Sequence, residues 1–174
     1  MIVKILQSGE PKLREVSKPV GKIDKKIKTI IKDLKNTLSI QRQPEGVGLA
    51  APQIGKNIRI FVINYKNIKR VIINPEIVET SNKKDAGKKR RITMEGCLSL
   101  PNYYGELKRA AYIKLRYLNE EGKDVVEDFK DFYAQIVLHE IDHLEGKLFI
   151  DQLIKQGKPM YKLVGNEWEE VELT

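Results

Sequence analysis

The sequence lacks two features that are common in secreted or membrane proteins, namely several cysteines and long apolar runs. It contains one cysteine, which excludes an internal disulfide and suits a reducing compartment. No apolar run approaches the length of a membrane span. The first residues lack the apolar core and the cleavage site of a secretory signal. These absences predict a cytoplasmic protein without a membrane partner.

Internal repeats, low-complexity tracts and linkers are also missing. With 174 residues, 41% hydrophobic and 32% charged, the chain fits one soluble domain spanning residues 1–174. We expect this domain to be a monomer.

The net charge of +8 indicates an anionic partner, and the densest basic cluster is residues 83–91. Aromatic residues make up only 7% of the chain, and no nucleic-acid-binding motif is present, so we expect no specific nucleic-acid recognition. Two interpretations stay open for the cluster. It is either a solvated loop or a weak, transient contact with RNA or the ribosome.

Histidine is nearly absent too, and both copies fall in one motif. Residues 139–143 read H-E-I-D-H, an H-E-x-x-H pattern. On an α-helix, residues four apart share a face, so His139 and His143 can bind one metal ion. Glu140 can then reach a metal-bound water. Apolar residues at helical spacing and a stop at Gly146 predict a helix over residues 131–145.

The rest of the chain predicts an α+β fold. Asp24 is a suitable N-cap for an amphipathic helix that continues to about Leu38. We expect mostly antiparallel β-sheets packed around the central metal-binding helix, plus this N-terminal amphipathic helix. The expected strands are residues 58–64, 71–74 ended by Pro75 and paired with 77–80, 103–117, and 125–129 after a turn at 119–122.

A catalytic metal site needs a third protein ligand. One large class of metalloproteases places a third histidine six residues after the second, but this chain has Phe149 there. The remaining candidates are a glutamate of the tail (Glu167, Glu169 or Glu170) and the single Cys97. A tail glutamate as the third ligand favours a peptidase. The residues alone leave both candidates, a tail glutamate and Cys97, open.

Three segments together resemble a known family. The stretches G-V-G-L-A-A-P-Q at 46–53, E-G-C-L-S at 95–99 and H-E-I-D-H at 139–143 are similar to the three signature motifs of peptide deformylase, in the same order and at similar spacing. The likeness extends from residue 11 to about residue 151. It implies an enzyme that removes the N-formyl group from the formyl-methionine of nascent polypeptides, which would be its partners.

The resemblance also implies a metal centre. Cys97, His139 and His143 would bind one divalent ion. Many members use Fe²⁺ physiologically, whereas Zn²⁺, Ni²⁺ or Co²⁺ can replace it in a purified sample. A metal-bound water would attack the formyl carbonyl, with Glu140 as general base and then general acid. Gln53 and the backbone N–H of Leu98 would stabilise the oxyanion.

Substrate-binding residues follow from the same resemblance. The backbone at Val47, Gly48 and Gly96 would hold the substrate main chain as an added strand. Val47, Phe132 and Ile136 would form the walls of the pocket for the methionine side chain.

The sequence departs from the family pattern at one substrate contact. Many deformylases have an arginine a few residues beyond the cysteine loop, and the best-matching position here is Tyr104. Arg109 lies further on and is interpreted as structural. The tail, with glycines, a proline and an acidic end, also differs from the C-terminal helix by which some members dock on the ribosome.

Overall fold

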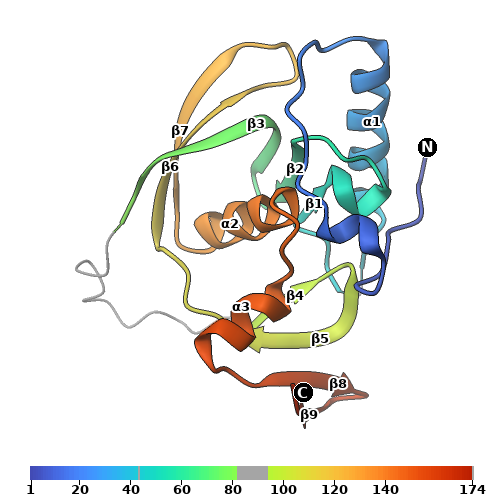
Figure 1. Cartoon of the computed structure of the whole chain (residues 1–174), viewed down its shortest axis with the longest axis vertical. Helices are drawn as coiled ribbons and strands as arrows, with labels where there is room; N and C mark the ends of the chain where they lie inside the picture. The colour runs from blue at the N-terminus through green and yellow to red at the C-terminus, as the bar shows by residue number, and fades with distance from the viewer. Residues whose placement is uncertain (43, 82–93, 174) are drawn as a thin grey trace.

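The computed structural model of the chain describes residues 1–42, 44–81 and 94–173. The basic cluster at 83–91 lies outside the described residues. In the described part, two antiparallel sheets and three α-helices form the molecule, and α2 lies between the sheets near the centre (Figure 1). The predicted α+β fold with mostly antiparallel strands is therefore confirmed.

The larger sheet has five strands in the order β1-β2-β3-β6-β7. Its residues are rich in Ile, Val, Leu and Phe, which fit a pleated, half-buried surface. One face packs on α1 and the other on α2, in two separate clusters of buried apolar side chains. The strands are β1 (Gly48–Ala50), β2 (Ile60–Tyr65), β3 (Ile68–Thr80), β6 (Tyr112–Leu118) and β7 (Asp124–Lys130).

The smaller sheet has four strands in the order β4-β5-β8-β9. Its C-terminal hairpin, β8–β9, lies at the lower end of the molecule in Figure 1. Phe149 and Leu153 from α3 pack with Met160 in a small apolar cluster against this sheet. The strands are β4 (Met94–Cys97), β5 (Leu100–Glu106), β8 (Met160–Val164) and β9 (Glu167–Val171).

The helices begin and end as their capping residues dictate. The Asp24 side chain accepts a hydrogen bond from the N–H of Ile27, as the N-cap prediction requires. After α2, Gly146 takes a φ of +69°, and a Cβ there would lie 2.4 Å from the Arg14 carbonyl oxygen, so glycine is required. The helical elements are η1 (Pro11–Arg14), α1 (Lys25–Ser39), η2 (Ala51–Ile54), α2 (Phe132–Leu144) and α3 (Phe149–Gln156).

Three strand predictions were wrong. Pro75 does not end a strand: β3 continues through it with register shifts, and the Asn74 side chain bonds both to the N–H and to the C=O of Val20. The 77–80 segment therefore extends the 71–74 segment instead of pairing with it. Residues 103–117 form two strands in different sheets, because the chain leaves β5 at Glu106 and enters β6 at Tyr112. The turn between β6 and β7 is where the sequence predicts it.

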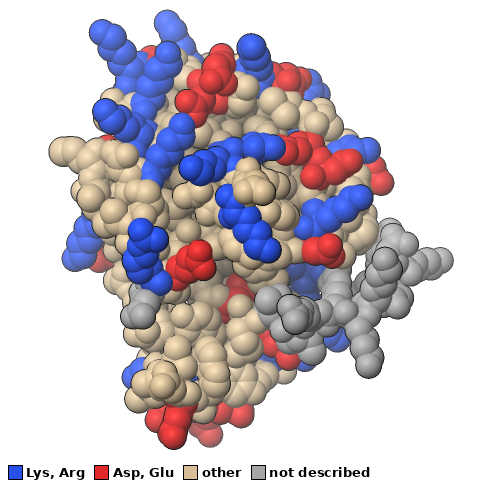
Figure 2. All heavy atoms as spheres, turned by 180° about the vertical axis from the view of Figure 1, so that it is seen from behind, with Lys and Arg blue, Asp and Glu red and all other residues tan. Residues whose placement is uncertain are grey.

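Charge is distributed unevenly over the surface. On the face seen in Figure 2, lysine and arginine gather over the upper part, and acidic side chains lie at the lower end. The described helices include none that is long and apolar enough to cross a membrane.

Candidate active site

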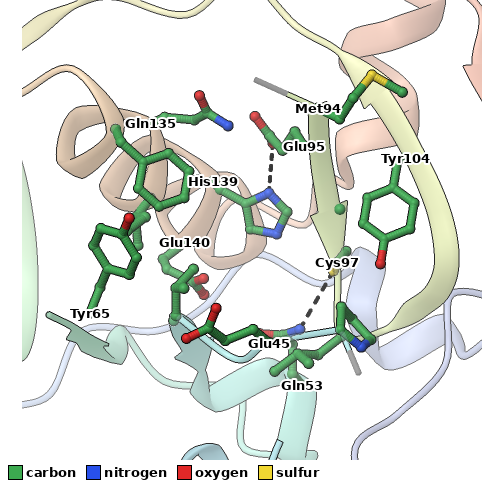
Figure 3. A pocket seen from close by; sticks show the side chains of 17 residues that line it. Glu45, Gln53, Tyr65, Met94, Glu95, Cys97, Tyr104, Gln135, His139 and Glu140 are labelled. Atoms are coloured by element: carbon green, nitrogen blue, oxygen red, sulfur yellow. Dashed lines mark hydrogen bonds and ion pairs between the residues drawn. The ribbon is translucent and has the colours of Figure 1, made fainter. Parts of the chain in front are cut away.

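A cavity of about 320 Å³ opens between α2 and the edges of the two sheets (Figure 3). Apart from His143, which is buried beneath it, every predicted site residue lines this cavity. These lining residues are Val47, Gly48, Gln53, Gly96, Cys97, Leu98, Tyr104, Phe132, Ile136, His139 and Glu140.

The single cysteine and the two histidines meet at the floor of the cavity. One ligand atom from each of Cys97, His139 and His143 lies within 4.8 Å of the others. Among the described residues, no other group of three His, Cys, Asp or Glu side chains is placed to share an ion. The tail glutamates belong to or follow β9 and are not part of this group.

The local structure explains how Cys97 reaches α2. The register between β4 and β5 shifts between Gly96 and Cys97, where the chain turns tightly. Along β4, side chains alternate between the two faces of the sheet. Glu95 and Cys97 therefore point to the α2 side, where they contact His139 and His143 respectively.

The donor atoms fit a divalent ion. Cys97 Sγ lies 3.3 Å from His143 Nε2. His139 Nδ1 donates to Glu95 Oε1 at 2.7 Å, which leaves its Nε2 for the centre. A tetrahedral zinc centre, with bonds of about 2.3 Å to sulfur and about 2.0 Å to nitrogen, spaces its ligand atoms about 3.5 Å apart. The buried set of one sulfur and two imidazole nitrogens therefore suits such an ion in its chemistry, and the Cys97–His143 distance is close to that spacing.

Burial shapes the charge state of the two histidines. It lowers the pKa of His143 well below its ordinary value, which keeps the ring neutral. For His139, burial acts in the same direction, but the nearby Cys97 and Glu95 outweigh it and raise the pKa well above its ordinary value. Cys97 and Glu95 thus favour positive charge on His139.

Glu95 anchors His139 through a buried ion-pair network. Its carboxylate accepts hydrogen bonds from Arg109 Nε and Nη2 at 2.7 and 2.6 Å, and Arg109 Nη1 donates to Asp142 at 3.0 Å. Burial alone would raise the pKa of Glu95, but the hydrogen bonds from Arg109 and His139 lower it to about 2. A carboxylate behind a histidine fixes the tautomer and orientation of the ring. Arg109 thus connects Glu95 of β4 to Asp142 of α2 behind the His139 ring.

Glu140 is a buried carboxyl with an unsatisfied oxygen. It is 3% exposed, and its Oε2 has no hydrogen-bond partner among the residues that the structure describes. Burial raises its pKa to about 7, against the opposing charges of His139 and Arg109. A Cβ at Gly48 would lie 2.4 Å from Glu140 Oε1, so only glycine leaves room for this carboxyl.

The Gln53 side chain points towards the sulfur of Cys97 (Figure 3). Its Oε1 accepts the N–H of Ala50 at 2.9 Å, and its Nε2 donates to Ser99 Oγ at 3.0 Å and towards Cys97 Sγ at 3.7 Å. These contacts hold the amide N–H at the cavity floor. Leu98, between Cys97 and Ser99, lies in the same turn.

Two strand edges border the cavity. In the described sheets, β1 is one of the two outer strands of the larger sheet and β4 is one of the two outer strands of the smaller one. Val47 and Gly48 line the cavity from the first edge, and Gly96 lines it from the second. Across the opening, Phe132 of α2 packs edge-to-face on Tyr65, with ring centroids 4.8 Å apart.

Sequence reasoning missed several lining residues. Glu95 stood in a motif, but its role depends on contact with Arg109 and His139, which no local pattern reveals. The aromatic wall from Tyr65 is likewise a product of tertiary packing. The lining residues missed are Pro44, Glu45, Tyr65, Met94, Glu95 and Gln135.

Comparison with known proteins gives a consistent result. The family model for polypeptide deformylase matches residues 2–159. A peptide deformylase of Pseudothermotoga lettingae is 44% identical over 151 residues, which are 87% of this chain and 82% of that protein. The crystal structure of peptide deformylase from Thermotoga maritima superimposes with a TM-score of 0.77 and 38% identity, covering 87% of this chain and 97% of that chain.

A third likeness is to a structure with a bound peptide. The Met-Ala-Ser-bound crystal structure of a class I type b peptide deformylase from Acinetobacter baumannii has a TM-score of 0.75 and 30% identity, over 87% of this chain and 98% of that chain. With the three motifs assembled in one cavity and these likenesses over most of its length, the chain belongs to the polypeptide deformylase family of enzymes.

Proposed function

We propose that residues 1–174 act as one catalytic domain that hydrolyses the N-formyl group of formyl-methionine on nascent polypeptides. The observation that carries this proposal is the position of Glu140, whose unsatisfied carboxylate oxygen is buried beside the convergent Cys97, His139 and His143. A buried carboxyl without a partner is costly, which is typical of a group reserved for chemistry.

Cys97, His139 and His143 would hold one divalent cation. When bound, such an ion supplies Lewis acidity, which polarises the formyl carbonyl and makes water acidic enough to react near neutral pH. Glu95 and Arg109 orient the His139 ring for this role. We assign Fe²⁺ as the physiological ion, with Zn²⁺, Ni²⁺ or Co²⁺ as replacements in purified samples. Elemental analysis after anaerobic purification tests this assignment.

The remaining chemistry belongs to side chains and backbone of the chain. Glu140 accepts a proton from the attacking water as the new C–O bond forms. It returns that proton to the amine as the C–N bond breaks, so that formate and a free N-terminus are the products. The amide N–H of Gln53 and the backbone N–H of Leu98 donate to the oxygen on which negative charge develops.

The substrate main chain would lie between β1 and β4 as an added strand. Outer strands offer backbone hydrogen-bonding groups to an extended peptide. Val47 and Gly48 would bind from one side and Gly96 from the other. The methionine side chain would enter the pocket walled by Val47, Phe132 and Ile136. The peptide Met-Ala-Ser bound to the related Acinetobacter baumannii enzyme has the sequence of such a product.

The substrate places the activity in the cytoplasm, where nascent chains emerge. We propose a monomer that contacts the ribosome transiently. Support comes from the net charge of +8 and from the lysine and arginine side chains gathered over the upper part of the face in Figure 2. Phosphate backbones attract such a surface without sequence preference.

Hydrolysis of formyl-Met-Ala-Ser, followed by formate release, tests the proposed function directly. Wild-type protein should release formate and Met-Ala-Ser. The Glu140→Gln variant should keep its metal and lose turnover, whereas Cys97→Ala should lose the metal as well. Formate release at the wild-type rate by Glu140→Gln would contradict the proposed mechanism.

A further inference from the structure

The outer face of α1 carries a row of lysines. Five of the 15 residues of this helix are lysine, and only Asp33 is acidic. Residues three or four positions apart lie on the same face of a helix. At about 1.5 Å per residue, a row that spans ten residue steps is about 15 Å long. The exposed lysines that follow this spacing, called the lysine row below, are Lys25, Lys28, Lys32 and Lys35.

Few acidic side chains neutralise the lysine row. Lys35 pairs with Glu120 of the β6–β7 turn, and Asp33 pairs with the amine of Met1. Lys25, Lys28 and Lys32 belong to no ion pair of the residues that the structure describes. Acidic side chains gather instead at the lower end of the face in Figure 2. The row therefore presents positive charge to solvent with little compensation.

This arrangement costs the helix stability. Lysines at positions i, i+3 and i, i+4 repel each other. Beyond the N-cap, no acidic residue stands in the first turn of α1, where the helix dipole is positive, and Lys25 and Lys26 occupy that turn instead. An exposed helix face that only has to be soluble can alternate glutamate and lysine, which attract each other. A row of one sign becomes favourable when an anionic partner neutralises it.

The chemistry of the lysine row favours a nucleic-acid backbone over lipid or protein. The apolar side chains of α1 are buried against the larger sheet, so the helix has no apolar face to place in a membrane. Protein interfaces are anchored by aromatic or apolar residues near their centre, and the row contains none. A polynucleotide carries a phosphate on every nucleotide, so evenly spaced lysines neutralise several phosphates together.

We propose that the lysine row of α1 is the surface by which this protein contacts ribosomal RNA. The inference rests on the proposed function, which brings the protein to nascent chains and so selects ribosomal RNA among polyanions. α1 and α2 cover opposite faces of the larger sheet (Figure 1), and none of the described residues that line the active-site cavity belongs to α1. A phosphate backbone lying along the row therefore leaves the cavity open to the nascent chain.

Fluorescence anisotropy with a mixed-sequence RNA duplex as the probe measures this contact. The triple variant Lys25→Gln, Lys28→Gln and Lys32→Gln removes the three unpaired lysines of the row. We expect its dissociation constant at low salt to rise about ten-fold. The slope of log K against log salt concentration should fall in magnitude by about three, one for each lost phosphate contact. Sedimentation with purified ribosomes should rank the proteins in the same order.

A second triple variant separates the row from net charge. Lys108→Gln, Lys147→Gln and Lys155→Gln remove three lysines that are also exposed and belong to no ion pair of the described residues. Both variants lower the net charge of +8 by the same three units. The control should bind RNA nearly as wild-type protein does.

Folding and activity are checked on the same samples. The melting temperature of the α1 variant should not fall, because the substitutions relieve repulsion between lysines. Both variants should hydrolyse formyl-Met-Ala-Ser at the wild-type rate, because none of these lysines lines the cavity.

The outcomes separate this surface from the proposed function. Wild-type affinity and salt slope in the α1 variant overturn the inference, and so do equal losses in both variants, which assign binding to net charge alone. Tighter binding of wild-type protein to anionic phospholipid vesicles than to RNA also overturns it. No turnover of formyl-Met peptides by metal-loaded wild-type protein contradicts the proposed function and leaves the RNA affinity as measured.

Discussion

The two sides of the active-site cavity are held in different ways. On the inner side, formed by β1, η2 and α2, Gln53 is 1% exposed and Glu140 is 3% exposed. On the outer side, Tyr104 of β5 is supported by the half-exposed Trp168 of β9. Buried groups have one arrangement because each atom is packed against others, whereas surface contacts leave more freedom.

This difference separates the residues placed to carry out the reaction from those placed to select the substrate. The inner side has to hold reacting groups within a fraction of an ångström, which burial and hydrogen bonds provide. The outer side has to meet varied peptide residues, and it lies partly beyond the residues that match the family. We expect substitutions on the inner side to abolish turnover and substitutions on the outer side to change substrate preference.

Arg109 joins β4 to α2 through Glu95 and Asp142, and its loss should have the largest effect. Arg109→Leu removes the cation from the buried Glu95 and Asp142 carboxylates, which should lower the free energy of unfolding by about 3–5 kcal/mol. Arg116→Leu is the control, because its pair with Asp124 is half exposed and should leave stability nearly unchanged. Urea denaturation measures both, and equal losses would contradict the buried role of Arg109.

Gln53→Ala should affect chemistry and leave substrate binding largely unchanged. Loss of an oxyanion donor should lower kcat by about 100- to 1000-fold with little change in KM. Ser99→Ala removes only one partner of the Gln53 amide and should have a much smaller effect. Steady-state kinetics with a formyl-Met peptide distinguish the two. If Gln53→Ala mainly raised KM, Gln53 would instead be a ground-state contact.

Gly48→Ala tests how tightly the inner side is packed. The added Cβ would overlap Glu140 Oε1 and displace the carboxyl, so we expect kcat to fall about 100-fold. Gly21→Ala is the matched control, since a Cβ there meets nothing within 4 Å and should leave kcat unchanged. A normal kcat in Gly48→Ala would show that Glu140 can move without loss.

The partly buried Glu127 should give the smallest effect. Burial alone would raise the pKa of Glu127, but hydrogen bonds from Arg70 and Tyr117 lower it. Its stabilising contribution is therefore present above the unfolded pKa of about 4.3 and disappears as pH falls through the lower folded value.

Glu127→Gln should accordingly reduce stability at pH 7 by less than about 1 kcal/mol, because solvent screens this pair. The difference from wild type should shrink below about pH 4. Thermal unfolding at several pH values measures this trend. A difference that grew in acid would show that the pair does not act as its geometry indicates.

Local patterns in the sequence predicted the helices α1 and α2. The N-cap at Asp24, the stop at Gly146 and the H-E-x-x-H spacing depend on contacts within a few residues, so they were predicted before the fold was known. The wrong prediction at Pro75 shows the limit of these local patterns. Pro75 ends a strand by local rules, but a register shift and the Asn74 contacts with Val20 accommodate it within β3.

The C-terminal residues show the same limit of local sequence patterns. Glycines and a proline indicated turns and little more, yet the residues after Leu148 form α3 and a hairpin that completes the small sheet. A hairpin strand with three glutamates among its five residues has weak local preference for any structure. The pairing of β9 with β8, the pairing of β8 with β5 and the packing of the hairpin against α3 decide its conformation.

By itself, the sequence determined the metal-binding residue types, the helix that presents two of them and the family resemblance. These depend on short spacings that the helical period converts directly into geometry. Only the tertiary structure decided that Cys97 and not a tail glutamate joins the two histidines, that Glu95 and Arg109 support His139, and that Trp168 backs Tyr104. Each of these contacts joins residues far apart in the chain, and long-range packing, not local preference, selects them.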